Sequence, residues 1–407
     1  MTSRVVVVGA SLAGATAATT LRELGFDGTI DVIGAETELP YERPALSKTF
    51  LGGQGSADDL LVNAAAEYDA LSIRMHLGEP AVGLDTARRL VTMANGSSIE
   101  YDDVVIATGS VNRRPDLPGI DLDGVHQLRT LGDAAALRSH AGRAKRAVIV
   151  GQGFIGCEVA ASLRSRGLDV TMVDPQPGPL YGPLGADVSA RVAEWHRSNG
   201  VVLLNEVGIA ELTGAGHVEG VRLDDGIALP AALVVVGVGA RPASDWLSGS
   251  GLRMERGAVL VDTAGRSSAN GVYAVGDVSA WWDDELAKHH HVEHYDAALV
   301  QGQRVAHTIL GSTAGPRSRS WFWSDQYEHT LQYAGARQAD DELRWRGGTG
   351  FWLRHGAVTA VVSLDDGRTF RRAMALIGQR PQVDALLDDS VDLRSLRPSP
   401  QPISALA

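Results

Sequence analysis

The chain has 407 residues and carries 37 Lys and Arg against 49 Asp and Glu, a formal net charge of −12. At about 150 residues per domain, this length predicts two to three domains, and the negative charge argues against duplex nucleic acid or anionic lipid as the main partner. The single cysteine, Cys157, excludes a disulfide framework, a CxxC redox centre and a cysteine-rich zinc or iron–sulfur site on this chain. It also agrees with a cytoplasmic location.

The N-terminal residues predict a strand, a glycine turn, a helix and a second strand. Residues 5–8 are four consecutive valines, which is typical of a strand buried on both faces. Gly9, Ser11 and Gly14 follow as a turn of the GxGxxG type, then an alanine-rich helix and a strand at 29–33. This order is the context of a dinucleotide-binding unit. A secretory signal peptide is the weaker interpretation of the same residues, and no stretch is apolar enough to predict a transmembrane helix.

The first turn departs from the usual pattern at its middle position. Ser11 stands where a glycine normally lets the backbone approach a pyrophosphate. Serine is small, so a nucleotide site is still expected, with a Rossmann-like turn that binds no nucleotide as the alternative. Glu36 best meets the acidic position after the second strand, because the residue before it is Ala35.

A second unit of the same kind begins at residue 146 and matches the fingerprint fully. A strand at 146–150 leads into the turn, and a helix is expected at 157–166, followed by a strand that ends before Asp174. Asp174 lies 23 positions after Gly151, close to the spacing expected for an acid that binds ribose hydroxyls. No arginine stands beside it for a 2′-phosphate, which favours NAD over NADP. The residues expected at the pyrophosphate are Gly151, Gly153, Phe154, Ile155 and Gly156. Two such units suggest two nucleotides serving one reaction, and a flavin with a nicotinamide is a natural pair.

Further motifs, in order along nearly the whole chain, resemble the FAD-dependent, NADH-using ferredoxin reductases of bacterial oxygenase systems. These enzymes are of the putidaredoxin reductase type and share a fold family with apoptosis-inducing factor. The segment at 40–48 is similar to the family's PYxRPxLSK motif. The resemblance implies that Arg43 contacts FAD and that Lys48 lies near the reactive edge of the flavin. It also implies that Glu158 pairs with Lys48, so that the pair could stabilise reduced flavin.

Later motifs extend the resemblance through the C-terminal third. An ATG segment at 107–109, a GxGxRP segment at 237–242, a Gly-Asp motif at 276–277 and an FWSDQ segment at 322–326 match the family in order. Where the family has Arg-Pro before its FAD-contacting arginine, this chain has Val111 and Asn112. The FAD contacts that the resemblance implies here are Ala107, Thr108, Gly109, Arg113, Asp277, Glu293, His294 and Trp323, with Gly239 at the NAD site.

The fold that the resemblance implies is α/β, with two Rossmann-like nucleotide-binding domains of the glutathione-reductase type and a C-terminal α+β domain. The FAD-binding domain is split between 1–112 and 240–318, and the NADH-binding domain is inserted at 113–239. The C-terminal domain spans 319–407, with a strand at 357–364 and a short helix at 383–388. The tail from Pro398 is expected to be poorly ordered.

The implied function is hydride transfer from NADH to FAD, followed by single-electron transfer to an iron–sulfur ferredoxin that supplies a monooxygenase or dioxygenase. Lys48, Glu158 and Trp323 are the expected catalytic residues. Because no cysteine stands in the segment at 41–48, a disulfide reductase is not expected. A rubredoxin, a quinone or oxygen could be the acceptor instead, and a redox-sensing FAD- and NADH-binding interaction protein is the other alternative. No nucleic acid or membrane partner is expected, and the chain is expected to be a monomer or a weak dimer.

Two further features have competing interpretations. His290 and His294 have i, i+4 spacing on an expected helix, but no HExxH motif is present, so no metal is expected. Six arginines in the C-terminal third could steer an acidic ferredoxin or could be an ordinary charged surface, because acids are interspersed. They are Arg317, Arg319, Arg337, Arg344, Arg346 and Arg354.

Overall fold

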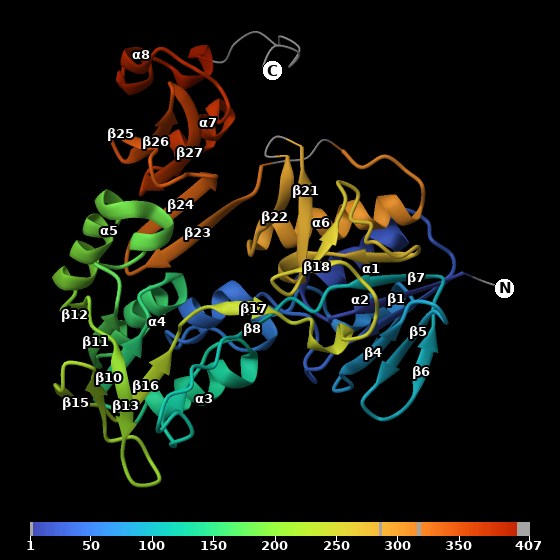
Figure 1. Cartoon of the computed structure of the whole chain (residues 1–407), viewed down its shortest axis with the longest axis horizontal. Coiled ribbons are helices and arrows are strands. Elements are labelled where there is room, and N and C mark those ends of the chain that lie inside the picture. The colour runs from blue at the N-terminus through green and yellow to red at the C-terminus, as the bar shows by residue number, and fades with distance from the viewer. Residues whose placement is uncertain (1–2, 285–286, 316–318, 397–407) are drawn as a thin grey trace.

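The computed structural model describes residues 3–284, 287–315 and 319–396. Two parallel sheets form two lobes that lie side by side, and the C-terminal strands lie beyond helix α5 (Tyr181–Ser198) (Figure 1). The predicted α/β class with a further sheet-rich C-terminal unit is confirmed. Arg317 and the tail from Pro398 lie outside the described residues, so those two expectations have no structural counterpart.

The first parallel sheet combines strands from distant parts of the chain. Its order is β20-β7-β1-β2-β3, and every pairing in it is parallel. The strands are β1 (Arg4–Val8), β2 (Thr29–Ile33), β3 (Ile73–His76), β7 (Asp103–Ile106) and β20 (Val272–Ala274). The return of β20 to the edge beside β7 shows that the chain comes back to this sheet after building the second lobe.

The second parallel sheet has the order β12-β11-β10-β16-β9. Its strands are β9 (Val125–His126), β10 (Arg146–Val150), β11 (Asp169–Asp174), β12 (Val202–Asn205) and β16 (Leu233–Val236). The β16 strand is buried at every position, as expected for a central strand covered on both faces.

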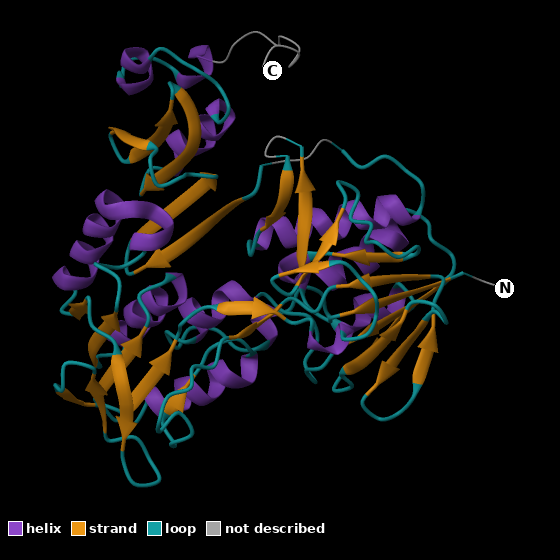
Figure 2. Ribbon diagram, viewed as in Figure 1, coloured by secondary structure: helices purple, strands orange, loops and turns teal. Residues whose placement is uncertain are grey.

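Helices flank both sheets (Figure 2). The first lobe carries α1 (Leu12–Glu23), α2 (Ala65–Ala70) and α6 (Tyr295–Ile309), and the second carries α3 (Leu131–Ala141), α4 (Phe154–Ser165) and α5. Helices α1 and α6 approach closely at Gly302, where an added Cβ would lie 2.6 Å from the Ala13 carbonyl oxygen. Glycine at this position therefore permits the packing of the two helices.

Small antiparallel elements complete the two lobes. A two-stranded ribbon of β8 (Ser110–Asn112) and β17 (Ala240–Pro242) links them (Figure 1). The others are β4 (Ala81–Asp85), β5 (Leu90–Met93) and β6 (Ser98–Glu100); β13 (Ile209–Thr213), β14 (Gly220–Leu223) and β15 (Ala228–Pro230); and β18 (Met254–Glu255), β19 (Ala258–Val261), β21 (Ser279–Asp283) and β22 (Lys288–His291).

The C-terminal unit is a five-stranded antiparallel sheet with two short helices. Its order is β23-β24-β27-β26-β25. The elements are β23 (Trp321–Gln326), β24 (His329–Gly335), β25 (Glu342–Arg346), β26 (Thr349–Arg354), β27 (Ala357–Leu364), α7 (Gly367–Ala373) and α8 (Val383–Leu387). The predicted strand at 357–364 and short helix near 383 are confirmed.

Two expectations about helices differ from the structure. Helix α4 begins at Phe154, directly at the glycine turn, and ends one residue before the predicted end at 166. The prediction of one helix that carries both His290 and His294 is wrong. His290 lies in β22, which pairs with β21 through Trp281, and His294 is the N-cap of α6. Cross-strand pairing with β21 therefore overrides the helical spacing of the two histidines.

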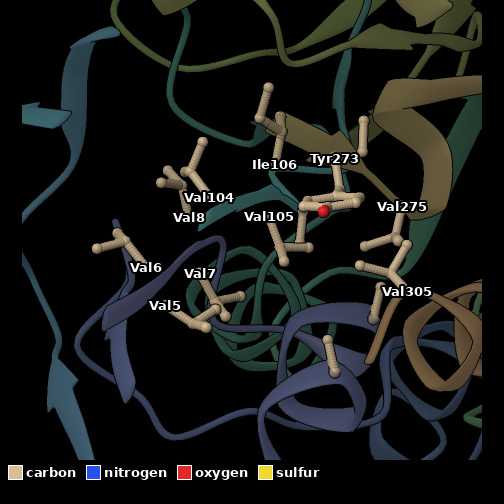
Figure 3. Close-up of a cluster of buried hydrophobic side chains, with 14 of the residues drawn as sticks. Val5, Val6, Val7, Val8, Val104, Val105, Ile106, Tyr273, Val275 and Val305 are labelled. Atoms are coloured by element: carbon tan, nitrogen blue, oxygen red, sulfur yellow. The ribbon is translucent and has the colours of Figure 1, made fainter. Parts of the chain in front are cut away.

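The core of the first lobe forms between β1, β7 and the helix layer. Val5, Val7, Val105 and Tyr273 pack with Val305 of α6 in this cluster (Figure 3). Burying these apolar side chains is the main favourable term in folding the lobe. Among the described residues, no helix is both long and apolar enough to cross a membrane.

Candidate functional site

One cavity of about 840 Å³ connects the two glycine turns and the C-terminal unit. Ser11 lines it from the first turn, Phe154 and Ile155 from the second, and Trp323 from β23. Its volume is within the range of about 300–1,000 Å³ typical of cofactor sites. The predicted residues that line it are Ser11, Arg43, Lys48, Ala107, Thr108, Gly109, Phe154, Ile155, Glu158, Asp277, Glu293, His294 and Trp323.

In the first turn, the two outer glycines are required by backbone contacts. Gly9 has φ +123°, and a Cβ there would lie 2.1 Å from the Ala107 carbonyl oxygen. A Cβ at Gly14 would lie 2.0 Å from the carbonyl oxygen of Gly9. Ser11 caps α1 with extended backbone and makes no side-chain capping bond, so its hydroxyl remains available to a ligand in the cavity.

The second turn repeats this arrangement with a glycine in the middle. Cβ atoms at Gly151 and Gly156 would lie 2.2 Å and 2.1 Å from the carbonyl oxygens of Gly237 and Gly151. Gly153 meets no protein atom within 4 Å, so packing within the protein does not require glycine there. An open position at the N-terminus of α4, where backbone N–H groups are not used within the helix, suits an anion such as a pyrophosphate.

Asp174 braces the second turn from the end of β11. Its carboxylate accepts hydrogen bonds from the backbone N–H groups of Gln152, at 2.6 Å, and Gln176, at 2.8 Å. Each oxygen retains a further acceptor site, because a carboxylate oxygen has two lone pairs. Asp174 can therefore fix the turn and still accept a ribose hydroxyl.

Glu36 is held in a cluster beside the first turn. Its carboxylate pairs with Arg43 at 2.6 Å and accepts a hydrogen bond from the hydroxyl of Tyr41. Burial raises the pKa of Tyr41, and Glu36 raises it further. Arg43 lines the cavity and also donates to the carbonyl oxygen of Arg129, at 2.6 Å. The cluster therefore orients a cationic side chain along the cavity wall.

Arg129 is a cavity residue that the sequence analysis missed. It forms an ion pair with Asp277 at 3.0 Å, and its Nε donates to the carbonyl oxygen of Ser110. Ser110 in turn donates its hydroxyl to Asp277. The three residues come from distant segments, so no local pattern could join them. An arginine before a capping Thr at the start of α3 was the only signal, and it is a weak one.

The ion pair expected between Lys48 and Glu158 is formed, with 3.0 Å between Nζ and Oε1. Glu158 is only 3% exposed. Its carboxylate also accepts hydrogen bonds from the hydroxyls of Ser47 and Ser324. A buried charge is tolerated when it is paired and hydrogen-bonded in this way. Ser47 and Ser324 lie inside the recognised motifs, but their support of Glu158 depends on tertiary contacts.

Aromatic side chains form the wall beside this ion pair. The ammonium of Lys48 lies 5.7 Å from the ring centroid of Trp323, within reach of a cation–π interaction. Tyr295 packs edge-on against Trp323, and Phe154 packs edge-on against Phe322. The second turn and the C-terminal unit therefore meet at the same wall.

Glu293 and His294 line the cavity where α6 begins. Burial raises the pKa of Glu293, and the nearby Asp277 adds to that shift. Burial lowers the pKa of His294 to about 4, so its ring is neutral at pH 7. Its Nδ1 lies 2.9 Å from the hydroxyl of Ser320. No group of three or more His, Cys, Asp or Glu among the described residues is arranged to hold a metal ion.

Several predicted residues lie outside the cavity lining. Arg113 is exposed on the β8–β17 ribbon and donates to the carbonyl oxygen of Ala240 at 2.8 Å. Gly239, with φ +99°, accepts from the backbone of Arg113 on the same ribbon. The predicted residues that do not line the cavity are Gly9, Gly14, Glu36, Arg113, Gly151, Gly153, Gly156, Asp174 and Gly239.

Arg337, one of the six arginines expected either to steer a ferredoxin or to form an ordinary charged surface, lines the cavity. It follows β24 and donates from Nη1 to the carbonyl oxygens of Gly182 and Pro183, both at 3.1 Å. Helix α5 is broken at Gly185, which has φ +81°, so these two carbonyls end a single helical turn. Because helix ends leave carbonyls without intrahelical donors, Arg337 caps a turn that forms part of the cavity wall.

Comparison with known proteins agrees with this geometry. A family model described as pyridine nucleotide-disulphide oxidoreductase matches residues 3–302, and one described as reductase C-terminal matches residues 321–397. The chain is 36% identical over 404 residues to the ferredoxin–NAD(+) reductase subunit of the benzene 1,2-dioxygenase system of Pseudomonas putida, covering 97% of this chain and 98% of that protein. It is 38% identical over 367 residues to a ferredoxin–NAD(P)(+) reductase of a Sphingomonas species, covering 89% and 88%.

A solved structure shows the same arrangement. The reductase in the covalent putidaredoxin reductase–putidaredoxin complex superimposes with a TM-score of 0.93 at 29% identity, covering 97% of this chain and 98% of that one. The resemblance found in the sequence motifs is thereby confirmed, and the chain belongs to the pyridine nucleotide-disulphide oxidoreductase family.

Proposed function

We propose that this protein is an FAD-dependent oxidoreductase that oxidises NADH and reduces an iron–sulfur ferredoxin of a monooxygenase or dioxygenase system. The observation that carries the proposal is one cavity that both glycine turns, the Lys48–Glu158 pair and Trp323 line together. The names of the relatives support the choice of ferredoxin as partner.

The residues present fit both nucleotides. The first turn with Ser11, together with Arg43, Arg129 and Asp277, would hold FAD along the first lobe. The second turn would hold the pyrophosphate of NADH over the open position at Gly153, with ribose on Asp174. Ile155 is 45% exposed at the start of α4, an apolar surface that a bound nicotinamide nucleotide would cover. We also retain the proposed division into FAD-binding (1–112 and 240–318), NADH-binding (113–239) and C-terminal domains (319–407).

When bound, the two groups supply hydride transfer from nicotinamide to flavin and release of single electrons. The contribution of the chain is alignment, exclusion of water and charge stabilisation. Lys48 holds a positive charge at the cavity wall, and Glu158 with its two serines fixes the position of that charge. Trp323 contributes an aromatic surface beside Lys48, at which we place the approach of the ferredoxin.

We further propose a cytoplasmic protein that acts as a monomer or weak dimer and binds neither nucleic acid nor membranes. The single cysteine supports the cytoplasmic location, and the net charge of −12 argues against nucleic acid and anionic membranes as partners.

Anaerobic stopped-flow absorbance tests the function. The flavin should bleach quickly with NADH, more slowly with NADPH, and regain its colour when a [2Fe–2S] ferredoxin is added. Slow reduction that no ferredoxin reverses would overturn the proposal and favour another acceptor or a redox-sensing role. A purified protein that retains no flavin would overturn the assignment of the first turn.

A further inference from the structure

Buried polar side chains continue from Glu158 into the interface between α5 and β23. Ser324 and Gln326, two residues apart on β23, are both 0% exposed. The hydroxyl of Ser324 donates to Glu158 Oε1 at 2.7 Å, and the amide Nε2 of Gln326 donates to Ser324 Oγ at 3.1 Å. Because burying a polar group costs free energy unless it is hydrogen-bonded, each donor and acceptor in this row must find a partner.

The direction of these hydrogen bonds follows from the chemistry of the groups. A carboxylate that pairs with Lys48 only accepts, so Ser324 must donate its proton to Glu158. The Ser324 oxygen then accepts from the amide of Gln326. The carbonyl oxygen Oε1 of Gln326 therefore faces away from Glu158 and requires a donor of its own.

His196 of α5 is the neighbouring side chain that can supply that donor. It is 0% exposed, and its Nδ1 lies 2.9 Å from the hydroxyl oxygen of Tyr327. His196 Nε2 and Gln326 Oε1 are both buried, and neither has a hydrogen-bond partner within bonding distance among the described residues. The Gln326 side chain lies close enough to the His196 ring to raise its pKa, against the larger effect of burial. Burial lowers the pKa of His196 to about 4, so one ring nitrogen carries the proton at pH 7.

Only one tautomer of His196 satisfies both neighbours. With the proton on Nε2, the ring can donate to Gln326 Oε1 after a small approach of the two side chains, and it accepts at Nδ1 from Tyr327. With the proton on Nδ1, two acceptors, Nε2 and Oε1, would face each other in a dry interface. The donors of Tyr327, His196, Gln326 and Ser324 therefore all point toward Glu158.

We propose that Tyr327, His196, Gln326 and Ser324 form a one-directional hydrogen-bond chain that fixes Glu158, and through it Lys48, for the reaction. The inference rests on the proposed function, and its members beyond Ser324 are positioning residues rather than catalytic ones. Through this chain, α5 and the C-terminal unit act on the Lys48–Glu158 pair. The amide of Gln326 is a poor proton carrier, so the chain orients charge and does not conduct protons.

Replacing Gln326 with Met tests the chain, because the volume is retained while the hydrogen bond to Ser324 and the proposed one from His196 are lost. Gln326→Met should lower the rate of flavin reduction at saturating NADH about tenfold, while the Kd for NADH changes less than twofold. The midpoint potential of the bound flavin should become more negative by about 30 mV, the two-electron equivalent of a tenfold change. The control is Gln303→Met, at an exposed position of α6, which should leave all three quantities unchanged.

A second substitution tests whether the effect passes through Glu158. In a Glu158→Gln background, Gln326→Met should shift the midpoint potential by less than the equivalent of a twofold change in the equilibrium constant for flavin reduction. An equal shift in both backgrounds, or no shift in a folded Gln326→Met protein, would overturn the proposal. If Gln326→Met does not fold, Tyr327→Phe provides the same comparison, with an expected fall of about twofold in the rate of flavin reduction. At the histidine, His196→Gln should shift the midpoint potential less than His196→Leu does.

The apoprotein separates this inference from the proposed function. Unfolding of the flavin-free protein should show that Gln326→Met and Glu158→Gln together destabilise less than the sum of the two single changes. If the two substitutions destabilise the apoprotein non-additively but NADH does not reduce the flavin of the holoprotein, the hydrogen-bond chain would be supported and the proposed function overturned. Additive effects in the apoprotein would overturn the chain, whatever the enzyme activity.

Discussion

The two glycine turns have the same backbone design but differ at one position and in the use of their acidic residue. In both, the outer glycines are required because a Cβ would collide with a carbonyl oxygen at 2.0–2.2 Å. The middle position is Ser11 in one turn and Gly153 in the other, and no protein atom lies within 4 Å of a Cβ added at Gly153. The outer glycines are therefore required by packing within the protein, whereas the residue at the middle position is constrained by the bound ligand.

The largest effect is expected from the outer glycines. Gly9→Ala and Gly151→Ala each introduce a Cβ at positive φ against a carbonyl oxygen, and each should lower the free energy of unfolding by about 2–4 kcal/mol. Thermal unfolding measures this. The control is Gly25→Ala, at φ +89° with nothing within 4 Å of its Cβ, which should cost less. Equal losses at Gly25 and Gly151 would show that backbone conformation alone accounts for the effect.

A smaller effect is expected at the start of α5, where an arginine of the C-terminal unit caps a helical turn of the second lobe. Arg337→Met removes the donors to Gly182 and Pro183, so the turn that lines the cavity loses its cap. The KM for NADH should rise about tenfold, equivalent to about 1.4 kcal/mol, with kcat changed less than threefold. Arg344→Met, at an exposed arginine of β25, should change neither constant. A fall in kcat at constant KM would contradict a role in binding.

The acidic residues that follow the two turns, Asp174 and Glu36, should differ in their effect on the preference for NADH over NADPH. Asp174→Ala removes the acceptor for ribose and the carboxylate that repels a 2′-phosphate, so the preference for NADH over NADPH should fall about tenfold. Glu36→Gln, in the cluster with Arg43 and Tyr41, should leave that preference unchanged. The ratio of kcat/KM for the two nucleotides measures both variants. An unchanged ratio in Asp174→Ala would remove Asp174 from the nucleotide site.

Exchanging the middle residues is expected to have the smallest effects. Gly153→Ser should alter the free energy of unfolding by less than about 0.5 kcal/mol, because the position is open, but should weaken NADH binding several-fold. Ser11→Gly should leave flavin retention within about threefold of the original, less than 1 kcal/mol. Flavin release on dilution and equilibrium titration with NADH measure the pair. A large loss of flavin in Ser11→Gly would show that the serine hydroxyl itself binds the ligand.

Sequence motifs predicted the parts of the site that lie close together along the chain. The valine strands, the glycine turns and their helices follow from local apolar patterns and from steric limits on glycine, and all of them are present, with α4 beginning earlier than expected, at Phe154. The Lys48–Glu158 pair came from the motif resemblance and is present. The local pattern gave a wrong prediction at His290, because this segment forms a strand by pairing with β21, and residue spacing within the segment does not reveal that pairing.

Tertiary structure alone decided the remainder. The Arg129–Asp277 pair, the cap that Arg337 places on α5, and the hydrogen bonds from Ser324 to Glu158 and between His196 and Tyr327 join residues far apart in the sequence. Single polar residues of this kind carry no periodicity or spacing to mark them. Their roles arise because burial removes water as a partner, so each buried donor or acceptor must find a counterpart on whichever segment the fold brings beside it.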